Sequence, residues 1–350
     1  MKSPKKVTIH YRKLARKPGT SPTLEEMVRT AMAKPGNRKI ALRSRYLERL
    51  YQNGSDNYFV NLYEDIQSGE SCVFGDVLHY TDGHLQALCQ TTDPEAESVP
   101  IHQLQAPSES QYVHSQMFWM IKNDHVFIIQ SISLKTAELE DYLSWLLHRK
   151  AAVLSDQIPV QLGAKFDIEK IGGKIDDIKE IVVGGITASA PPVSSPPPEY
   201  VEKTTEYVSQ EHLEQGKKTG RDTAYEVLSV LLGGDAKVDS VLAAIPADAE
   251  LDVQVHIGYK TRKRKTERIA MNQLETGLRH IPDSQLQVIA KGTKQGKDGS
   301  VRISHDAYVR LIRIPNREDE AYGSLLDPSD VLRAMIDAYA EMVARGKISE

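Results

Sequence analysis

The residues with the clearest chemical character in this sequence are cations gathered in one short run. Residues 260–268 contain six Lys or Arg and a single acid, Glu267, which gives this run a net charge of +5. Like charges three or four residues apart repel one another, whereas a polyanion neutralises them and releases its condensed counterions. The run therefore favours contact with nucleic-acid phosphates, and a solvated, solubilising loop is the alternative. Its candidate binding residues are Lys260, Arg262, Lys263, Arg264, Lys265 and Arg268.

Neighbouring residues indicate which kind of nucleic acid this run would meet. Lys291 and Lys294 lie in the next expected hairpin and extend the candidate surface. Tyr259 is the only aromatic residue beside the run, so contact with a duplex backbone is favoured over stacking on the bases of a single strand. The sequence shows no helix-turn-helix or zinc-finger pattern, and we expect no sequence-specific reading of bases.

A second concentration of cations lies at the N-terminus. The whole chain has a formal charge of −4, but residues 1–50 hold 14 Lys and Arg against three Glu, a net charge of +11. Within this segment Arg43 and Arg45 alternate with the apolar Leu42 and Tyr46, as expected for the exposed side of a partly buried element. We expect the two arginines to contribute to a DNA-facing surface. A basic membrane-binding patch is the alternative, but no cationic amphipathic helix accompanies them.

The standard catalytic signatures are missing from the sequence. It contains no phosphate-binding loop, no G-x-S-x-G nucleophile turn and no H-E-x-x-H zinc motif. His79 and His84 flank a turn but have no further ligand nearby in the sequence, which indicates surface histidines. One enzymatic alternative is a metal-dependent nuclease that would use four acids. The same acids also fit the solvent face of a hairpin. They are Asp167, Glu169, Asp176 and Asp177. We therefore expect no enzyme, no catalytic residue, no metal and no cofactor.

The hydropathy pattern and the cysteine content indicate the compartment. No stretch approaches the roughly 18 consecutive apolar residues that a membrane-spanning helix needs, and no apolar segment follows the N-terminal cations as it would in a secretory signal. Cys72 and Cys89 are too few for a disulfide framework. These features predict a reduced, cytoplasmic protein.

The length of 350 residues predicts two domains at roughly 100–200 residues each. Five prolines within residues 191–198 favour an extended spacer, because proline lacks a backbone donor. The expected division is an N-terminal α+β domain over 1–157, a strand pair over 158–190 that could join the domains, a Pro-rich linker or loop over 191–200, and a C-terminal α+β domain with the basic run over 201–350.

The fold class expected from the residue pattern is α+β, with a mostly antiparallel sheet and packed helices in each domain. Thr23 and Glu26 have the spacing of a capping box that begins a helix, and a second helix is expected over 136–151. Residues 91–110 contain three prolines and are expected to form an exposed loop. Apolar alternation predicts strands over 6–13, 58–66, 72–80, 84–89, 117–122, 125–131, 159–168, 174–183, 251–257, 286–290 and 301–314.

The last expected element is an amphipathic C-terminal helix. Asp327 or Ser329 would cap its N-terminus. One face of this helix is apolar and could cover either the chain's own sheet or a second copy of the protein. The residues of this candidate self-association face are Leu332, Met335, Ile336, Tyr339, Met342 and Val343.

The order of these segments resembles a known family. Residues 249–260 (AELDVQVHIGYK), the basic run, the glycine-rich hairpin 291–300 and the helix 330–347 resemble the C-terminal part of the RexA-like phage-exclusion family. The resemblance implies a cytoplasmic homodimer that binds double-stranded DNA without sequence preference. It also implies a sensor or regulator in abortive infection, an antiviral defence, with a membrane effector protein as partner. By position, the resemblance implies that the cations of 260–268 would contact DNA. A protein-interaction scaffold with an acidic partner remains an alternative.

Overall fold

The computed structural model divides the chain into two compact units, which are described separately. The first unit consists of Met1–Asp167, Thr266–His280 and Arg302–Glu350, and the second of Ile168–Lys265 and Ile281–Val301. The structure describes residues 4–17, 19–36, 39–69, 71–89, 101–167, 169, 178–189, 250–258, 275–281, 286–290, 293–295, 301–313 and 322–349.

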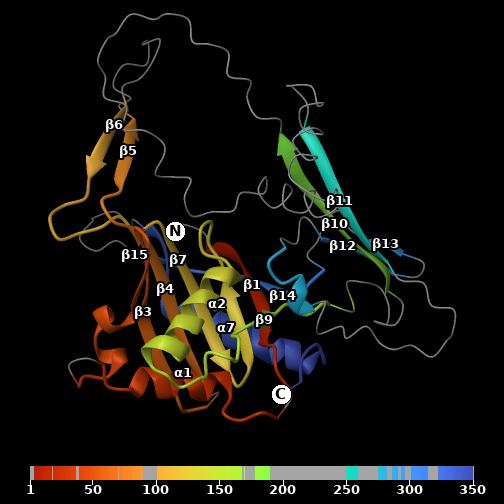
Figure 1. The fold of residues 1–350 in the computed structure, drawn as a ribbon, viewed down its shortest axis with the longest axis horizontal. Coiled ribbons are helices and arrows are strands. Elements are labelled where there is room, and N and C mark those ends of the chain that lie inside the picture. The colour runs from red at the N-terminus through yellow and green to blue at the C-terminus, as the bar shows by residue number, and fades with distance from the viewer. Residues whose placement is uncertain are drawn as a thin grey trace, which may run out of the picture. The chain divides into compact units, whose positions relative to one another are not determined.

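A large antiparallel sheet forms the first unit (Figure 1). Its strand order is β14-β1-β8-β7-β4-β3-β2, and β9 also pairs with β1. The strands are β1 (Lys5–Leu14), β2 (Leu50–Asn53), β3 (Asp56–Ile66), β4 (Cys72–Thr81), β7 (Ser115–Lys122), β8 (His125–Ile129), β9 (Leu162–Gly163) and β14 (Ser304–Val309). The mixture of helices with this sheet agrees with the α+β class expected from the sequence.

The central strands β7 and β8 are apolar on both faces. Met117 and Trp119 of β7 are buried with one core cluster, and the alternating residues Phe118 and Met120 are buried with a second cluster. A two-residue turn at Asn123-Asp124 joins β7 to β8, and Asn123 adopts the left-handed φ of 52°. Because neither face of these strands can be left in water, helices must cover the sheet on both sides.

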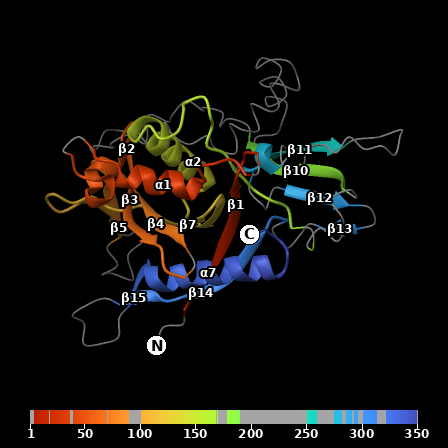
Figure 2. The same cartoon turned by 90° about the horizontal axis from the view of Figure 1, so that it is seen from below.

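Three helices provide this cover, as Figure 2 shows. α1 (Leu24–Ala33) and α2 (Thr136–Ser144) lie on one face, and α7 (Pro328–Ala344) lies on the other. The expected capping box begins α1, and Asp327 caps α7 by accepting from the amides of Ser329 and Asp330. Shorter helical segments are η1 (Leu42–Ser44), η2 (Tyr46–Arg49) and the π-helical turn η3 (Trp145–Lys150).

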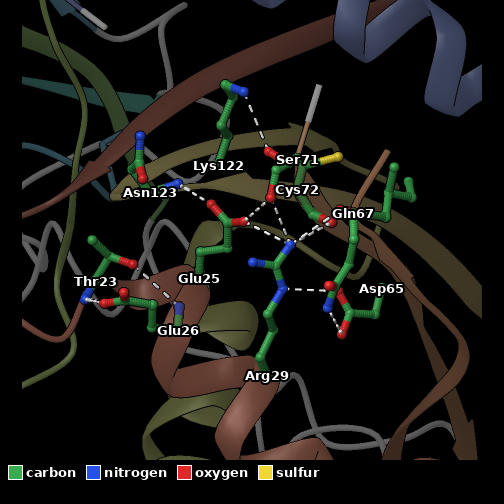
Figure 3. A network of polar contacts seen from close by, with 11 residues as sticks. Thr23, Glu25, Glu26, Arg29, Asp65, Gln67, Ser71, Cys72, Lys122 and Asn123 are labelled. Carbon is green, nitrogen blue, oxygen red and sulfur yellow. Dashed lines mark hydrogen bonds and ion pairs between the residues drawn. The ribbon is translucent and has the colours of Figure 1, made fainter. Parts of the chain in front are cut away.

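A buried carboxylate fastens α1 to the sheet (Figure 3). Glu25 is 4 % exposed, pairs with Arg29 at 2.8 Å and accepts hydrogen bonds from the Ser71 hydroxyl and the Asn123 amide. Arg29 Nε in turn donates to Asp65 of β3 at 2.8 Å. A buried charge is tolerated only when it is paired and hydrogen-bonded, and this network meets that condition while linking α1 to β3 and to the β7–β8 turn.

Two small ribbons complete the first unit. β15 (Leu311–Arg313) pairs with β16 (Tyr322–Leu326), and β5 (Leu85–Cys89) pairs with β6 (Ile101–Gln105). β6 lies in the stretch 91–110, which was expected to be a loop throughout.

In the second unit, a four-stranded antiparallel sheet has the order β11-β10-β12-β13. Its strands are β10 (Ile178–Ser189), β11 (Glu250–Gly258), β12 (Leu286–Ala290) and β13 (Thr293–Gln295).

The strand pairing differs from the expected domain division. Residues 201–350 were expected to form one domain, but Arg302–Glu350 belongs to the first unit, where β14 pairs with β1. β9 likewise pairs with β1, whereas β10 pairs with β11 and β12, so the described strands of the expected strand pair over 158–190 lie in different sheets. Pairing partners so distant in sequence depend on tertiary packing, which local alternation does not report. The Pro-rich stretch 191–200 lies outside the described residues.

The apolar face of α7 belongs to the core. Met335, Tyr339 and Met342 are buried against the sheet, and Leu332, Ile336 and Val343 pack at the margin of the same cluster. This face therefore covers the chain's own sheet, and its buried residues Met335, Tyr339 and Met342 are not available to a second copy. No helix among the described residues is long and apolar enough to cross a membrane.

A tyrosine–histidine pair is buried beneath α7. The Tyr11 hydroxyl lies 2.8 Å from His125 Nδ1, and both residues are at most 2 % exposed. Burial raises the pKa of Tyr11, so its hydroxyl stays protonated. The hydroxyl can therefore donate a hydrogen bond to the neutral imidazole. Burial, together with nearby lysines, lowers the pKa of His125 to about 4. Both groups are therefore uncharged at neutral pH.

The low pKa of His125 predicts a loss of stability in mild acid. Above pH 6.5 the imidazole is neutral in the folded and unfolded states, but between pH 6.5 and 4 only the unfolded chain takes up the proton. The free energy of unfolding should therefore fall by about 2 kcal/mol between pH 7.5 and 5 through this residue. Urea unfolding at both pH values should show a smaller fall in His125→Gln than in the wild type. His148→Gln, which replaces a less buried histidine, should keep the full wild-type fall. An equal fall of the unfolding free energy in all three proteins would contradict the assignment of this pH dependence to His125.

Gly75 gives a second test of the sheet. A Cβ there would lie 2.5 Å from the Leu62 carbonyl oxygen and 2.7 Å from Trp119 Cζ2. Asp76, which is 1 % exposed, accepts from the amides of Asn61 and Leu62 and holds this irregular part of β3 close to β4.

We predict that Gly75→Ala lowers the free energy of unfolding by about 1–3 kcal/mol, because the backbone cannot move aside without breaking the Asp76 contacts. Gly277→Ala is the matched control, since nothing lies within 4 Å of a Cβ at that position. Urea denaturation measures both variants. Equal stability of the two would show that the approach of β3 to β4 is not as tight as described.

Candidate nucleic-acid interface

The basic run itself follows the end of a strand. β11 ends at Gly258, two residues before Lys260, which agrees with the expectation that the run begins where a strand ends. Lys294 lies in β13, where its backbone is opposite Ile289 of β12. The remaining residues of this expected surface lie outside the described residues: Lys260, Arg262, Lys263, Arg264, Lys265, Arg268 and Lys291.

Arg43 lies in η1, and Arg45 lies between η1 and η2, shortly before β2. Arg43 is exposed, and its carbonyl oxygen accepts from Arg49 Nη1 at 2.9 Å. Arg45 Nη1 is 3.5 Å from Glu48 Oε1, and Glu48 also binds Lys150 Nζ at 2.6 Å. Of the two expected contact residues, Arg43 thus presents its charge to solvent, while that of Arg45 is offset by a carboxylate.

Most other described cations of the N-terminal segment hold the fold together. Arg16 binds Asp124 through Nε and Nη2, at 2.9 and 2.6 Å. Arg12 is 4 % exposed and donates to the Tyr11 carbonyl and the Thr136 hydroxyl. The net charge of +11 counted over residues 1–50 therefore overstates what this segment offers to a polyanion.

The fold creates an arginine pair that the sequence did not reveal. Asp330, in the first turn of α7, has a side chain that is 3 % exposed. Its Oδ1 accepts from Arg333 Nη2 and lies 3.3 Å from Arg310 Nη2, and its Oδ2 accepts from the Arg310 amide at 2.8 Å. Burial by itself would raise the pKa of Asp330, but the Arg310 amide and the two guanidinium groups outweigh it, so the pKa lies below its ordinary value.

Both arginines remain largely in solvent around this buried carboxylate. The side chains of Arg310 and Arg333 are 66 % and 68 % exposed. One carboxylate offsets only one of the two positive charges, so the group keeps an excess positive charge at the surface. No sequence signal marks the pair, because Arg310 follows β14 whereas Arg333 and Asp330 belong to α7.

Of the four acids named for the nuclease alternative, the structure describes only Asp167 and Glu169. Asp167 is 1 % exposed, and Lys347 Nζ lies 2.7 Å from its Oδ2. Glu169 is exposed, and Asp176 and Asp177 lie outside the described residues. This ion pair connects Lys347, in the segment Arg302–Glu350, to Asp167, the last residue of the segment Met1–Asp167 in the same unit. It therefore has a structural role.

A histidine cluster lies at the end of β4. His79 Nε2 is 2.9 Å from Asp56 Oδ1, and the His79 ring stacks on Tyr58 with centroids 4.7 Å apart. His114, which the sequence did not link to the pair, lies against both His79 and His84, with centroid distances of 5.3 and 4.2 Å. Across the described part of the chain, no group of three or more His, Cys, Asp or Glu has a geometry that could hold a metal ion.

Comparison with known proteins adds no family to this description. No protein-family model matches the chain, and no curated protein matches it. The candidate interface therefore rests on the sequence of the basic run and, among the described residues, on the exposed arginines and the carboxylates that offset them.

Proposed function

We propose that the protein binds double-stranded DNA through phosphate contacts, without preference for a base sequence. The observation that carries this proposal is the run of six cations within residues 260–268, which follows directly on the strand β11. β11 ends at Gly258, two residues before Lys260, and the cations of the run lie so close together in sequence that they would repel one another. Phosphates relieve that repulsion and release counterions as they bind.

The acidic remainder of the chain is compatible with this proposal. Residues outside the first fifty carry a net charge of −15 despite the basic run. An acidic body repels a polyanion everywhere except at its cationic surfaces, which restricts where DNA can bind. The absence of an aromatic residue among the cations of 260–268 supports duplex backbone over single-strand stacking as the target.

The biological setting is a second part of the proposal and rests on the resemblance to the RexA-like family. We infer a cytoplasmic sensor or regulator in phage exclusion that acts as a homodimer and signals to a membrane effector protein. Because α7 buries its apolar face in the core, the homodimer would use another surface. We also infer that the protein is not an enzyme, since the acid considered first for a nuclease, Asp167, is buried and paired with Lys347.

The central prediction concerns the salt dependence of DNA binding. Two duplexes of unrelated sequence should bind with similar affinity, and the logarithm of the affinity should fall linearly with the logarithm of the salt concentration. Replacing Arg262, Lys263, Arg264 and Lys265 together by Ala should weaken binding at least tenfold and reduce the salt slope by about 3–4, since each phosphate contact contributes about 0.9. Fluorescence anisotropy with labelled duplexes between 50 and 200 mM NaCl measures both quantities.

The matched control is the double variant Thr261→Ala and Thr266→Ala, which alters the same run without removing charge. It should bind as the wild type does. Circular dichroism and urea unfolding check that all variants fold. Absence of binding in low salt, or an affinity that does not change with salt, would reject the proposed function.

A further inference from the structure

We propose that Arg310 and Arg333 form a second phosphate-binding site, on the first unit, in which the buried Asp330 holds both guanidinium groups in place. This inference rests on the proposed function and names a contact site that lies outside the basic run. It begins from an imbalance of charge around one carboxylate. Two guanidinium groups reach Asp330 Oδ1, while the other oxygen is taken by the Arg310 amide.

The bonds to Asp330 leave donors on both arginines. Each arginine reaches Asp330 through Nη2, and a guanidinium carries five N–H donors in all. Among the described residues, no other acceptor binds either guanidinium group. Since both side chains are about two-thirds exposed, the remaining donors can reach a ligand in solvent.

A phosphodiester is the ligand that this arrangement fits. Guanidinium groups bind phosphate oxygens through two parallel hydrogen bonds, and a phosphate supplies the negative charge that the pair lacks. The shared contact with Asp330 restricts both long side chains before the ligand arrives, which lowers the entropic cost of binding. The nearby Asp327 caps α7, where its Oδ1 accepts from the amides of Ser329 and Asp330.

The fold adds a further cation beside the pair. β1 and β14 pair antiparallel, so Lys5 lies opposite Val309, the residue before Arg310. Lys5 is exposed, whereas the adjacent Lys6 is paired with Asp306 at 2.8 Å. Figure 2 shows β14 alongside α7, which brings the start of β1, the end of β14 and the start of α7 to one region of the unit.

A purely structural role for the two arginines is the competing interpretation. In that role they would only neutralise Asp330, and removing one would affect stability without affecting DNA. Arg345, the C-cap residue of α7, offers a matched control. Its side chain is 58 % exposed, and its Nη2 lies 2.7 Å from Oε1 of Glu341, a carboxylate that is itself 38 % exposed. Arg345 is therefore a similar surface arginine without an organised partner arginine.

The test compares Arg333→Gln with Arg345→Gln in the full-length protein. Arg333→Gln leaves Asp330 both its ion pair with Arg310 and its bond to the Arg310 amide, so the fold is expected to persist, and urea unfolding checks this. With a labelled 20-base-pair duplex, Arg333→Gln should weaken binding about three- to tenfold and reduce the salt slope by about 0.9, the value of one phosphate contact. Arg345→Gln should bind as the wild type does.

Three outcomes separate the two proposals. Loss of affinity and slope in Arg333→Gln alone supports the second phosphate site. If the wild type binds DNA and Arg333→Gln binds as Arg345→Gln does, the site is rejected while the proposed function stands. If the wild type does not bind the duplex even at 50 mM NaCl, both are overturned. Arg310→Gln, measured in the same way, should reproduce the result of Arg333→Gln.

Discussion

The structure of the first unit depends on the burial of both faces of its central strands. Phe118 and Phe127 point into one core cluster while Met117 and Val126 point into the other, so a helix layer on one side alone would leave large apolar side chains in water. α1 and α2 come from the N-terminal half, but the other face is covered by α7, near the opposite end of the chain. This requirement explains why Arg302–Glu350 belongs to the first unit and why the apolar face of α7 packs against the chain's own sheet.

The same compact packing determines which charges can act outside the protein. Carboxylates removed from solvent need cations, and the N-terminal segment supplies Arg29 to Glu25, Arg16 to the partly buried Asp124 and Arg45 to Glu48. Glu48 also pairs with Lys150, from beyond that segment. A charge count along the sequence cannot distinguish such cations from those that face solvent. Asp330 is the opposite case, because a single buried carboxylate there attracts two exposed arginines and leaves an excess of positive charge.

Local features of the fold could be predicted from the sequence, and distant contacts could not. The capping box of Thr23 with Glu26, the turn at Asn123-Asp124 and the Asp327 cap of α7 each depend on residues a few positions apart. The pairing of β1 with β14 and the grouping of Arg310 with Asp330 join residues that no periodic pattern links. β6 was hidden for another reason: its five residues lie within a stretch of prolines, serines and acids that is typical of a loop. For the candidate site, the residue types were visible in the sequence, but their exposure and their partners were not.

The two proposed contact regions differ in how they depend on folding. The cations of 260–268 are contiguous in sequence, so their charge density exists even in an unfolded chain. The second region exists only in the folded unit, since Lys5 reaches Val309 through strand pairing and the two arginines converge only when α7 lies beside the end of β14. Asp330 takes part in both the packing of α7 and the placing of the arginines, and replacing it would confound the two effects. Replacing Arg333 can separate the packing of α7 from the placing of the arginines, because the Arg310 amide and the Arg310 guanidinium still satisfy the buried carboxylate.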